Sequence, residues 1–155
     1  MKLFLDSNVV IDGLVDRSDS HDAARLLIAL GQLGVFSLWV SPTQWTDVFY
    51  ILTEGEKPSP LIEVKAKLEE LRKAIRVSTI GEAEIDKALT SAWDDFEDAV
   101  VYQAARTTQA AALITSNKDD FAQSDIPIYS PQEFFMWLEK EKNTIYAEVD
   151  LTTDD

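Results

Sequence analysis

Short apolar runs alternate along the chain with longer segments whose apolar residues recur every three or four positions. Runs rich in β-branched or aromatic residues predict five strands, over residues 2–5, 35–40, 76–79, 112–115 and 127–129. Helical spacing or composition between the runs predicts helices over 9–15, 22–33, 42–53, 61–74, 82–93, 95–107 and 131–140. Ser41-Pro42 and Ser130-Pro131 each combine a capping residue with a first-turn proline, which marks two of these helix starts.

Strands that alternate with helices favour right-handed crossovers and a parallel sheet. The sequence therefore predicts an α/β fold with three α/β/α layers around a central parallel sheet of about five strands. We assign residues 1–140 to this domain and 141–155 to an acidic C-terminal tail. In such sheets the ligand crevice lies at the carboxyl ends of the strands, where the strand order reverses.

Composition narrows the chemistry. The chain of 155 residues contains no cysteine, which excludes disulfides, thiolate zinc sites and cysteine nucleophiles. Its one histidine, His21, lies in the first turn of a helix that Ser18 or Asp19 can cap, so we expect it to be exposed. A formal net charge of −14 argues against broad, nonspecific nucleic-acid binding, although it leaves room for a local metal site or a basic protein partner.

Nothing in the sequence indicates a membrane protein. The amino terminus lacks the basic region and cleavage site of a signal peptide, and no apolar run approaches the roughly 20 residues that span a bilayer. We therefore expect a cytoplasmic protein without membrane association.

Acidic and amide side chains follow two of the predicted strands. Asp6 comes directly after the first strand, and Asn117, Asp119 and Asp120 follow the fourth. Parallel strands end at one edge of the sheet, so these side chains are candidates for a common site. Taken alone, Asp6 is equally well explained as the cap of the next helix, a role that Ser7 can also fill.

Two further acidic positions lie at or near helix starts. Asp95 and Asp98 share one face of a helix's first turn, where capping and the helix dipole offer an alternative explanation. We expect Glu97 to point elsewhere and to be solvated. Asp47 is flanked by Tyr50 and Ile51, so its charge is not on a plainly solvated surface and needs a partner, such as a shared cation.

Carboxylates gathered in one crevice raise one another's pKa values unless a cation holds them together. Mg²⁺ or Mn²⁺ fits a site built from oxygen ligands. An ion of this kind can activate water and stabilise charge on a phosphodiester during in-line attack.

Four segments in order resemble the motifs of the PIN-domain family, particularly those of VapC-type toxins of toxin–antitoxin pairs. The likeness covers about residues 1–138. The matching segments are LDSNVVID, SPTQWTDV, DFEDAVVYQAA and LITSNKDDF.

The resemblance implies a set of site residues. Its catalytic group comprises Asp6, Asp47, Asp98 and Asp120. Of these, Asp6, Asp98 and Asp120 are the implied metal ligands, direct or through water, and Asp120 is favoured over Asp119 because it precedes Phe121. The implied supporting or substrate-orienting residues are Asn8, Asp95, Thr115 and Asn117. Asp47 departs from the family, which usually has glutamate at this position.

The same resemblance implies a Mg²⁺- or Mn²⁺-dependent endoribonuclease that acts on RNA and is silenced by an antitoxin protein. A homodimer is expected as well, because the segments 42–52 and 61–71 carry more apolar surface than one small sheet needs. Two alternatives remain. One is a PIN-like module that binds a partner through an eroded acidic pocket, and the other is a Rossmann-like phosphohydrolase with Asp6 as nucleophile. The second is weakened by Asn8, where haloacid-dehalogenase-type enzymes have a second aspartate.

Overall fold

A parallel five-stranded sheet forms the centre of the computed structural model, which describes residues 1–146. Its strands are β1 (Lys2–Leu5), β2 (Ser37–Val40), β3 (Ile75–Val77), β4 (Ala112–Ile114) and β5 (Ile128–Tyr129). They lie in the order β3-β2-β1-β4-β5, and each neighbouring pair is parallel. The order reverses between β1 and β4, so the predicted crevice falls where these two strands end.

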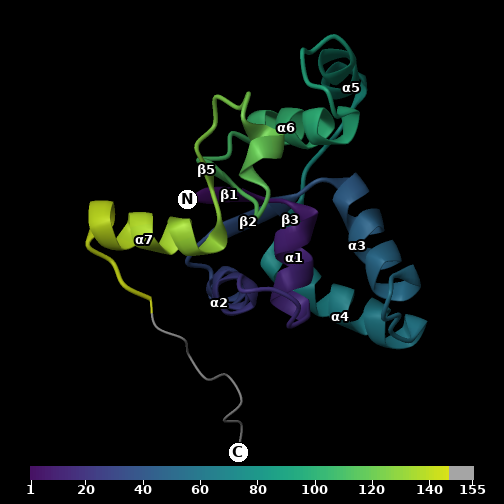
Figure 1. Ribbon diagram of the computed structural model, residues 1–155, viewed down its shortest axis with the longest axis vertical. Helices are drawn as coiled ribbons and strands as arrows, with labels where there is room; N and C mark the ends of the chain where they lie inside the picture. The colour runs from purple at the N-terminus through teal and green to yellow at the C-terminus, as the bar shows by residue number, and fades with distance from the viewer. Residues whose placement is uncertain (147–155) are drawn as a thin grey trace, which may run out of the picture.

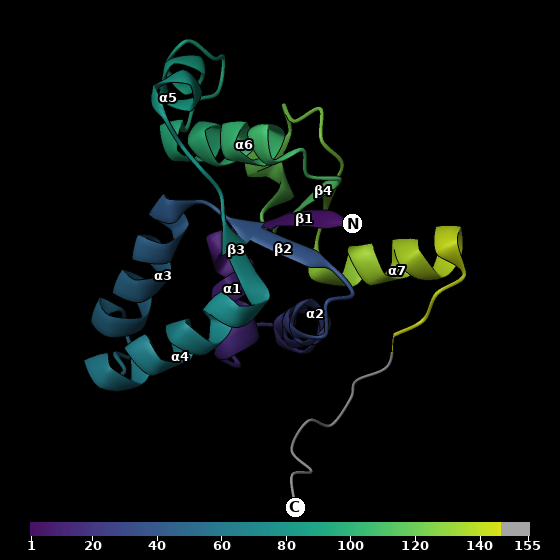
Figure 2. The same cartoon turned by 180° about the vertical axis from the view of Figure 1, so that it is seen from behind.

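Helices cover both faces of the sheet (Figures 1 and 2). They are α1 (Ser7–Leu14), α2 (His21–Gln32), α3 (Pro42–Glu54), α4 (Leu61–Ala74), α5 (Glu82–Leu89), α6 (Phe96–Thr108) and α7 (Pro131–Lys142). A short 3-10 helix, η1 (Lys118–Phe121), follows β4. This arrangement confirms the predicted three-layer α/β/α fold.

Alternate residues of β1 enter two different cores. Leu3 and Leu5 belong to the larger core, which also includes residues of α1, α2, α3, α4 and α7. Phe4 points to the opposite face, where it packs with Val101 and Ala104 of α6. A strand that is apolar on both faces is typical of a parallel sheet covered on both sides.

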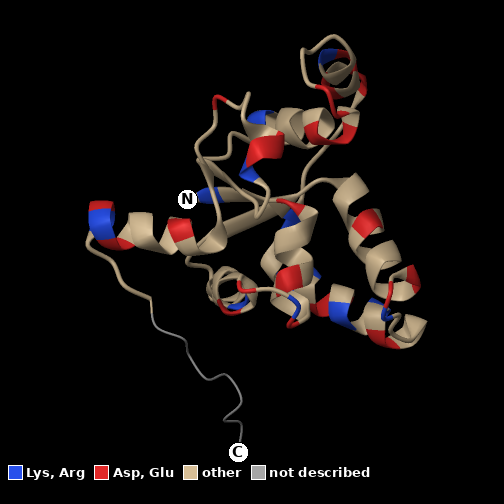
Figure 3. Cartoon of the chain, in the orientation of Figure 1, with Lys and Arg blue, Asp and Glu red and all other residues tan. Residues whose placement is uncertain are grey.

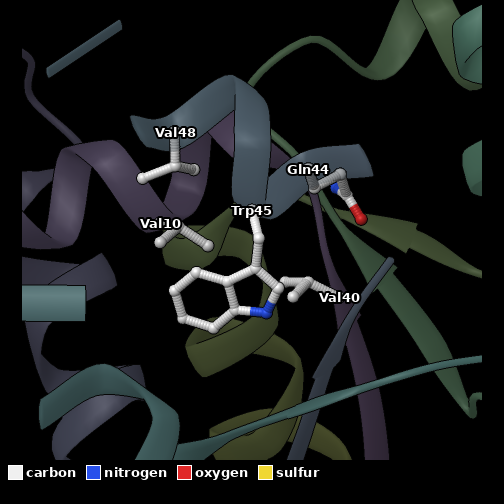
Figure 4. Close-up of a pocket in the computed structure, with 5 residues that line it drawn as sticks. All are labelled: Val10, Val40, Gln44, Trp45 and Val48. Carbon is white, nitrogen blue, oxygen red and sulfur yellow. The ribbon is translucent and has the colours of Figure 1, made fainter. Parts of the chain in front are cut away.

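Helix α3 is fixed to the sheet by its cap and by its inner face. The Ser41 hydroxyl accepts a hydrogen bond from the Gln44 amide, and the Ser41 amide donates to the Gln44 side chain, which completes a capping box. On the inner face of α3, Trp45 and Val48 lie against Val10 of α1 (Figure 4). The capping box predicted before residue 131 is confirmed too, with Ser130 as the cap.

Several predicted boundaries were wrong by a few residues. The helix expected from residue 9 begins at Ser7, because Asp6 caps it. The stretch expected to be helical to residue 93 ends at Leu89, because the hydroxyls of Thr90 and Ser91 bind the last carbonyl groups of α5. Trp93, beyond this end, stacks on Tyr102 of α6.

His21 is half-buried rather than exposed. Its Nδ1 atom lies 2.7 Å from the carbonyl oxygen of Asp12, so the ring joins α2 to α1. Neither Ser18 nor Asp19 caps α2, since Ser20 precedes it and makes no capping hydrogen bond with its side chain. No described helix is long and apolar enough to cross a membrane. The tail predicted at residues 141–155 starts two residues too early, because α7 continues to Lys142. Its residues from 147 onward lie outside the described residues.

Candidate functional site

An open cavity of about 410 Å³ lies where β1 and β4 end. Its lining residues come from the segment after β1, from α1 and the turn beyond it, from α3, from the start of α6, and from the segment after β4. They are Asp6, Ser7, Asn8, Ile11, Arg17, Asp47, Tyr50, Ile51, Glu97, Asp98, Asn117 and Asp120. Five of them are carboxylates. Figure 3 shows acidic positions on α3, at the start of α6 and in η1, around the point where α1 begins.

Asp6 both caps α1 and faces this cavity. Its Oδ1 atom accepts a hydrogen bond from the Ser7 amide at 2.7 Å. Its Oδ2 atom accepts from the Asn8 side chain at 2.9 Å and from the Thr115 hydroxyl at 2.8 Å. Burial raises the pKa of the Asp6 carboxyl and the Asp120 charge adds to this, although the three hydrogen bonds work in the other direction.

The two acids of the α6 start have different positions. Asp95 is the cap of α6, where its Oδ1 atom accepts a hydrogen bond from the Asp98 amide at 3.0 Å, and it does not line the cavity. Asp98 does line it. Burial, followed by the charges of Asp95, Asp120 and Asp6, raises the pKa of Asp98 to about 7. The capping interpretation therefore holds for Asp95, and Asp98 is the member of the pair inside the acidic cluster.

Glu97 was expected to point away from the site and to be solvated. It is exposed, but the expectation that it lies apart from the site was wrong. It lines the cavity, and its carboxyl makes a hydrogen bond with the carboxyl of Asp47 on α3. This contact, together with burial and the charges of Asp47, Asp95 and Asp98, raises the pKa of Glu97 to about 7. Asp47 itself keeps one buried oxygen, Oδ2, for which the described residues supply no donor. An oxygen of this kind suits a cation.

The segment after β4 brings in the remaining predicted residues. Asp120 lines the cavity and Asp119 does not. Thr115 is fully buried beneath Asp6, and its hydroxyl also accepts a hydrogen bond from the Asn117 amide at 3.0 Å. The Asn8 side chain spans the two segments, because its amide group donates to Asp6 while its oxygen accepts from the Ser116 amide.

The donor set fits a hard divalent cation, since it consists of carboxylate and amide oxygens. No three acidic or histidine side chains in residues 1–146 are close enough together to hold one metal ion in common. The carboxylates of Asp6, Asp98 and Asp120 thus share a cavity without a preformed ligand geometry. Side-chain rotation toward a cation is needed to complete it.

Comparison with known proteins adds a family and a relative of similar length. A family model described as PIN domain matches residues 2–119. Ribonuclease VapC1 of Aquifex aeolicus is 30% identical over 142 residues, which cover 86% of this chain and 92% of that protein.

Two solved structures share the fold at low sequence identity. VapBC2 from Rickettsia felis, bound to a DNA fragment from its promoter, superposes with a TM-score of 0.63 at 14% identity, over 84% of this chain and 98% of that one. VapC20 from Mycobacterium tuberculosis, a toxin that cleaves the sarcin–ricin loop, superposes with a TM-score of 0.59 at 14% identity, over 78% and 94%.

Proposed function

The chain belongs to the PIN-domain family, and from this premise we propose that it is a metal-dependent endoribonuclease that hydrolyses RNA phosphodiester bonds. We further propose that it is the toxin of a toxin–antitoxin pair. The observation that carries the proposal is the convergence of five carboxylates in one cavity at the carboxyl edge of the sheet. The relative Ribonuclease VapC1 supports the reaction class.

Asp6, Asp98 and Asp120 would hold Mg²⁺ or Mn²⁺, the ion that supplies an activated water and stabilises charge on the phosphate. Thr115 and Asn8 fix the direction in which Asp6 presents its oxygens. Asn117 lies at the cavity wall, where its side chain can orient the RNA backbone. The chemistry thus depends on carboxylates held by buried neighbours.

Glu97 offsets the departure at Asp47. Aspartate reaches about one methylene less far than the glutamate usual in the family, and the neighbouring Glu97 brings a second carboxyl to the same wall of the cavity. The pair together provides the negative charge that this side of the site requires.

An antitoxin protein is the expected partner. Structurally similar proteins include VapBC2 from Rickettsia felis and VapBC-1 from nontypeable Haemophilus influenzae. A chain with a net charge of −14 and an acidic cavity suits a basic inhibitory segment. Acting on cellular RNA, the protein would work in the cytoplasm.

One alternative keeps a supporting observation. A PIN-like module that only binds a partner is favoured by Asp47 and by the lack of a preformed ligand set in the described residues. The phosphohydrolase alternative is disfavoured, because Asn8 stands where such enzymes have a second aspartate and its side chain donates a hydrogen bond to Asp6.

RNA cleavage by the purified full chain tests the proposal. We expect cleavage of an RNA hairpin with a single-stranded loop in Mn²⁺ or Mg²⁺, and none in EDTA. Asp6→Asn should abolish cleavage, because the amide keeps the shape but loses the charge that binds the ion. Asp119→Asn makes the same charge change outside the cavity and should stay active. Cleavage that persists in EDTA or in Asp6→Asn would reject the mechanism, and partner binding without any cleavage would favour the binding module.

A further inference from the structure

Arg17 is the one lysine or arginine among the described residues that line the acidic cavity. It follows the end of α1 and reaches back to that helix, where its Nε atom donates a hydrogen bond to Asp12 Oδ1 at 2.7 Å. A cation in a cavity with five carboxylates invites the explanation that it neutralises them.

The contacts argue against this explanation. Within the described residues, Arg17 forms an ion pair with Asp12, and it pairs with none of the five cavity carboxylates. Asp12 does not line the cavity, and its side chain is only 4% exposed. The positive charge of Arg17 is therefore balanced by Asp12, a buried acid outside the acidic cluster.

Asp12 is itself held firmly. Its Oδ2 atom lies 3.4 Å from the Ser116 hydroxyl, and its carbonyl oxygen lies 2.7 Å from His21 Nδ1. These contacts join Asp12, the partner of Arg17, to α2 and to the segment after β4. Asp12, which orients the Arg17 side chain, is thus itself fixed by its position on α1 and by its contacts with α2 and with the segment after β4.

The end of the guanidinium remains available. Its Nε–H is used by Asp12, whereas no residue in the described chain accepts from the four N–H groups of the two terminal nitrogens. The side chain is 41% exposed. The two terminal nitrogens of a planar guanidinium, held in place through Nε, can donate a pair of hydrogen bonds to two oxygens of a phosphate group.

We propose that Arg17 binds a backbone phosphate of the RNA next to the scissile bond, with Asp12 as its positioning residue. The proposal rests on the proposed ribonuclease function and assigns to Arg17 the anchoring of the substrate. In a cavity whose other charged groups all repel RNA, this contact draws the strand in before the reaction begins.

Steady-state cleavage of a single-stranded RNA in Mn²⁺ at several NaCl concentrations tests the proposal. Arg17→Gln should raise KM roughly tenfold with little change in kcat, as expected for a contact present before the transition state. The slope of log KM against log salt should fall by about 0.7, the value for one phosphate contact with a single strand. Arg17→Lys keeps the charge, so it should retain the slope and show an intermediate KM.

The matched control is Arg106→Gln, which makes the same substitution at an exposed arginine on α6. It should leave KM and the salt slope at the wild-type values. Asp12→Asn should raise KM in the wild-type background and add nothing in Arg17→Gln, because it acts through Arg17. Melting curves show whether each variant is folded, and Arg17→Lys keeps the test decisive if Asp12→Asn is not.

The outcomes separate this proposal from the ribonuclease function. A wild type that cleaves RNA, beside an Arg17→Gln variant with unchanged KM and salt slope, would reject the phosphate contact and leave the function standing. An equal rise of KM in Arg106→Gln would also reject it, as an effect of net charge. A wild type that neither binds nor cleaves RNA would reject both.

Discussion

Asp98 is surrounded by the charges of other acids of the site. Its pKa is raised to about 7 by burial and by the charges of Asp95, Asp120 and Asp6. Removing its charge should relieve repulsion in the metal-free protein but also remove one of the proposed metal ligands. We predict that Asp98→Asn melts at a higher temperature than wild type in EDTA and gains much less on addition of millimolar Mn²⁺.

Glu82→Gln provides the control, because Glu82 is an exposed acid in the first turn of α5 and is not part of the cavity. It should lose only a few tenths of a kcal/mol from the helix dipole and keep the full metal shift. An Asp98→Asn protein that behaves in this way would show that Asp98 is only a helix-start residue.

Glu97 gives the stability a pH dependence. The pKa of its carboxyl rises from an ordinary 4.5 to about 7 in the folded protein, so the charged form opposes folding. This cost is fully present above about pH 7 and disappears as the pH falls toward 4.5. In EDTA we predict a higher melting temperature near pH 5.5 than near pH 8, and a smaller difference in Glu97→Gln.

The range from pH 5.5 to pH 8 lies above the range in which Glu133 changes the stability in the opposite direction. Lys118 and the Ser130 amide lower the pKa of Glu133, so the stabilisation from this group is lost only at pH values below its ordinary 4.5. A melting temperature that is equal at the two pH values, or a Glu97→Gln variant with the wild-type difference, would contradict the assignment of Glu97 to the acidic cluster.

At the scale of elements, Gln44 connects the start of α3 to the end of β1. Its Nε2 atom donates to the Leu5 carbonyl at 2.7 Å, and its Oε1 atom accepts from the Ser41 amide at 2.7 Å. Leu5 precedes Asp6, and Asp47 lies one turn after Gln44. The buried amide therefore sets the position of α3, with Asp47, relative to Asp6.

We predict that Gln44→Leu, of similar volume, lowers the free energy of unfolding by about 1–3 kcal/mol, because buried backbone groups lose a partner. Cleavage activity should fall as well, since Asp47 shifts. The control is Gln123→Leu, at an exposed glutamine that binds the Ala92 carbonyl, and it should change the stability by less than about 0.5 kcal/mol. Urea unfolding measures both, and a Gln44→Leu protein as stable as wild type would contradict the role.

At the scale of the whole molecule, exposed apolar side chains remain on the helix pair α3 and α4. Leu61 and Ile62 at the start of α4 are 53% and 80% exposed. We predict a homodimer that covers part of this surface. Light scattering should give twice the mass of the chain at micromolar concentration, and Ile62→Asp should shift it toward the monomer.

Leu89→Asp is the matched control, because Leu89 is 65% exposed at the end of α5, away from this surface. It should leave the mass unchanged. A wild-type monomer at micromolar concentration would refute the dimer.

The sequence alone determined the architecture and most of the acidic site. Hydrophobic period and capping chemistry act over a few residues, so they indicated the five parallel strands, the Ser41 and Ser130 caps and the place of Asp6 after β1. Once the strands are parallel, their ends share one edge, and this placed Asp6 beside the segment that carries Asp120.

Only the tertiary structure decided which further side chains, from other helices and loops, line the acidic cavity. Helical periodicity distinguishes the sides of a helix, but the contact of Glu97, in the first turn of α6, with Asp47 depends on how the fold places α6 relative to α3. Arg17 lies beyond the last turn of α1, outside any period, and its position depends on the buried Asp12. Both residues are placed by contacts between elements distant in sequence or beyond a helix end, and such contacts leave no local pattern to read.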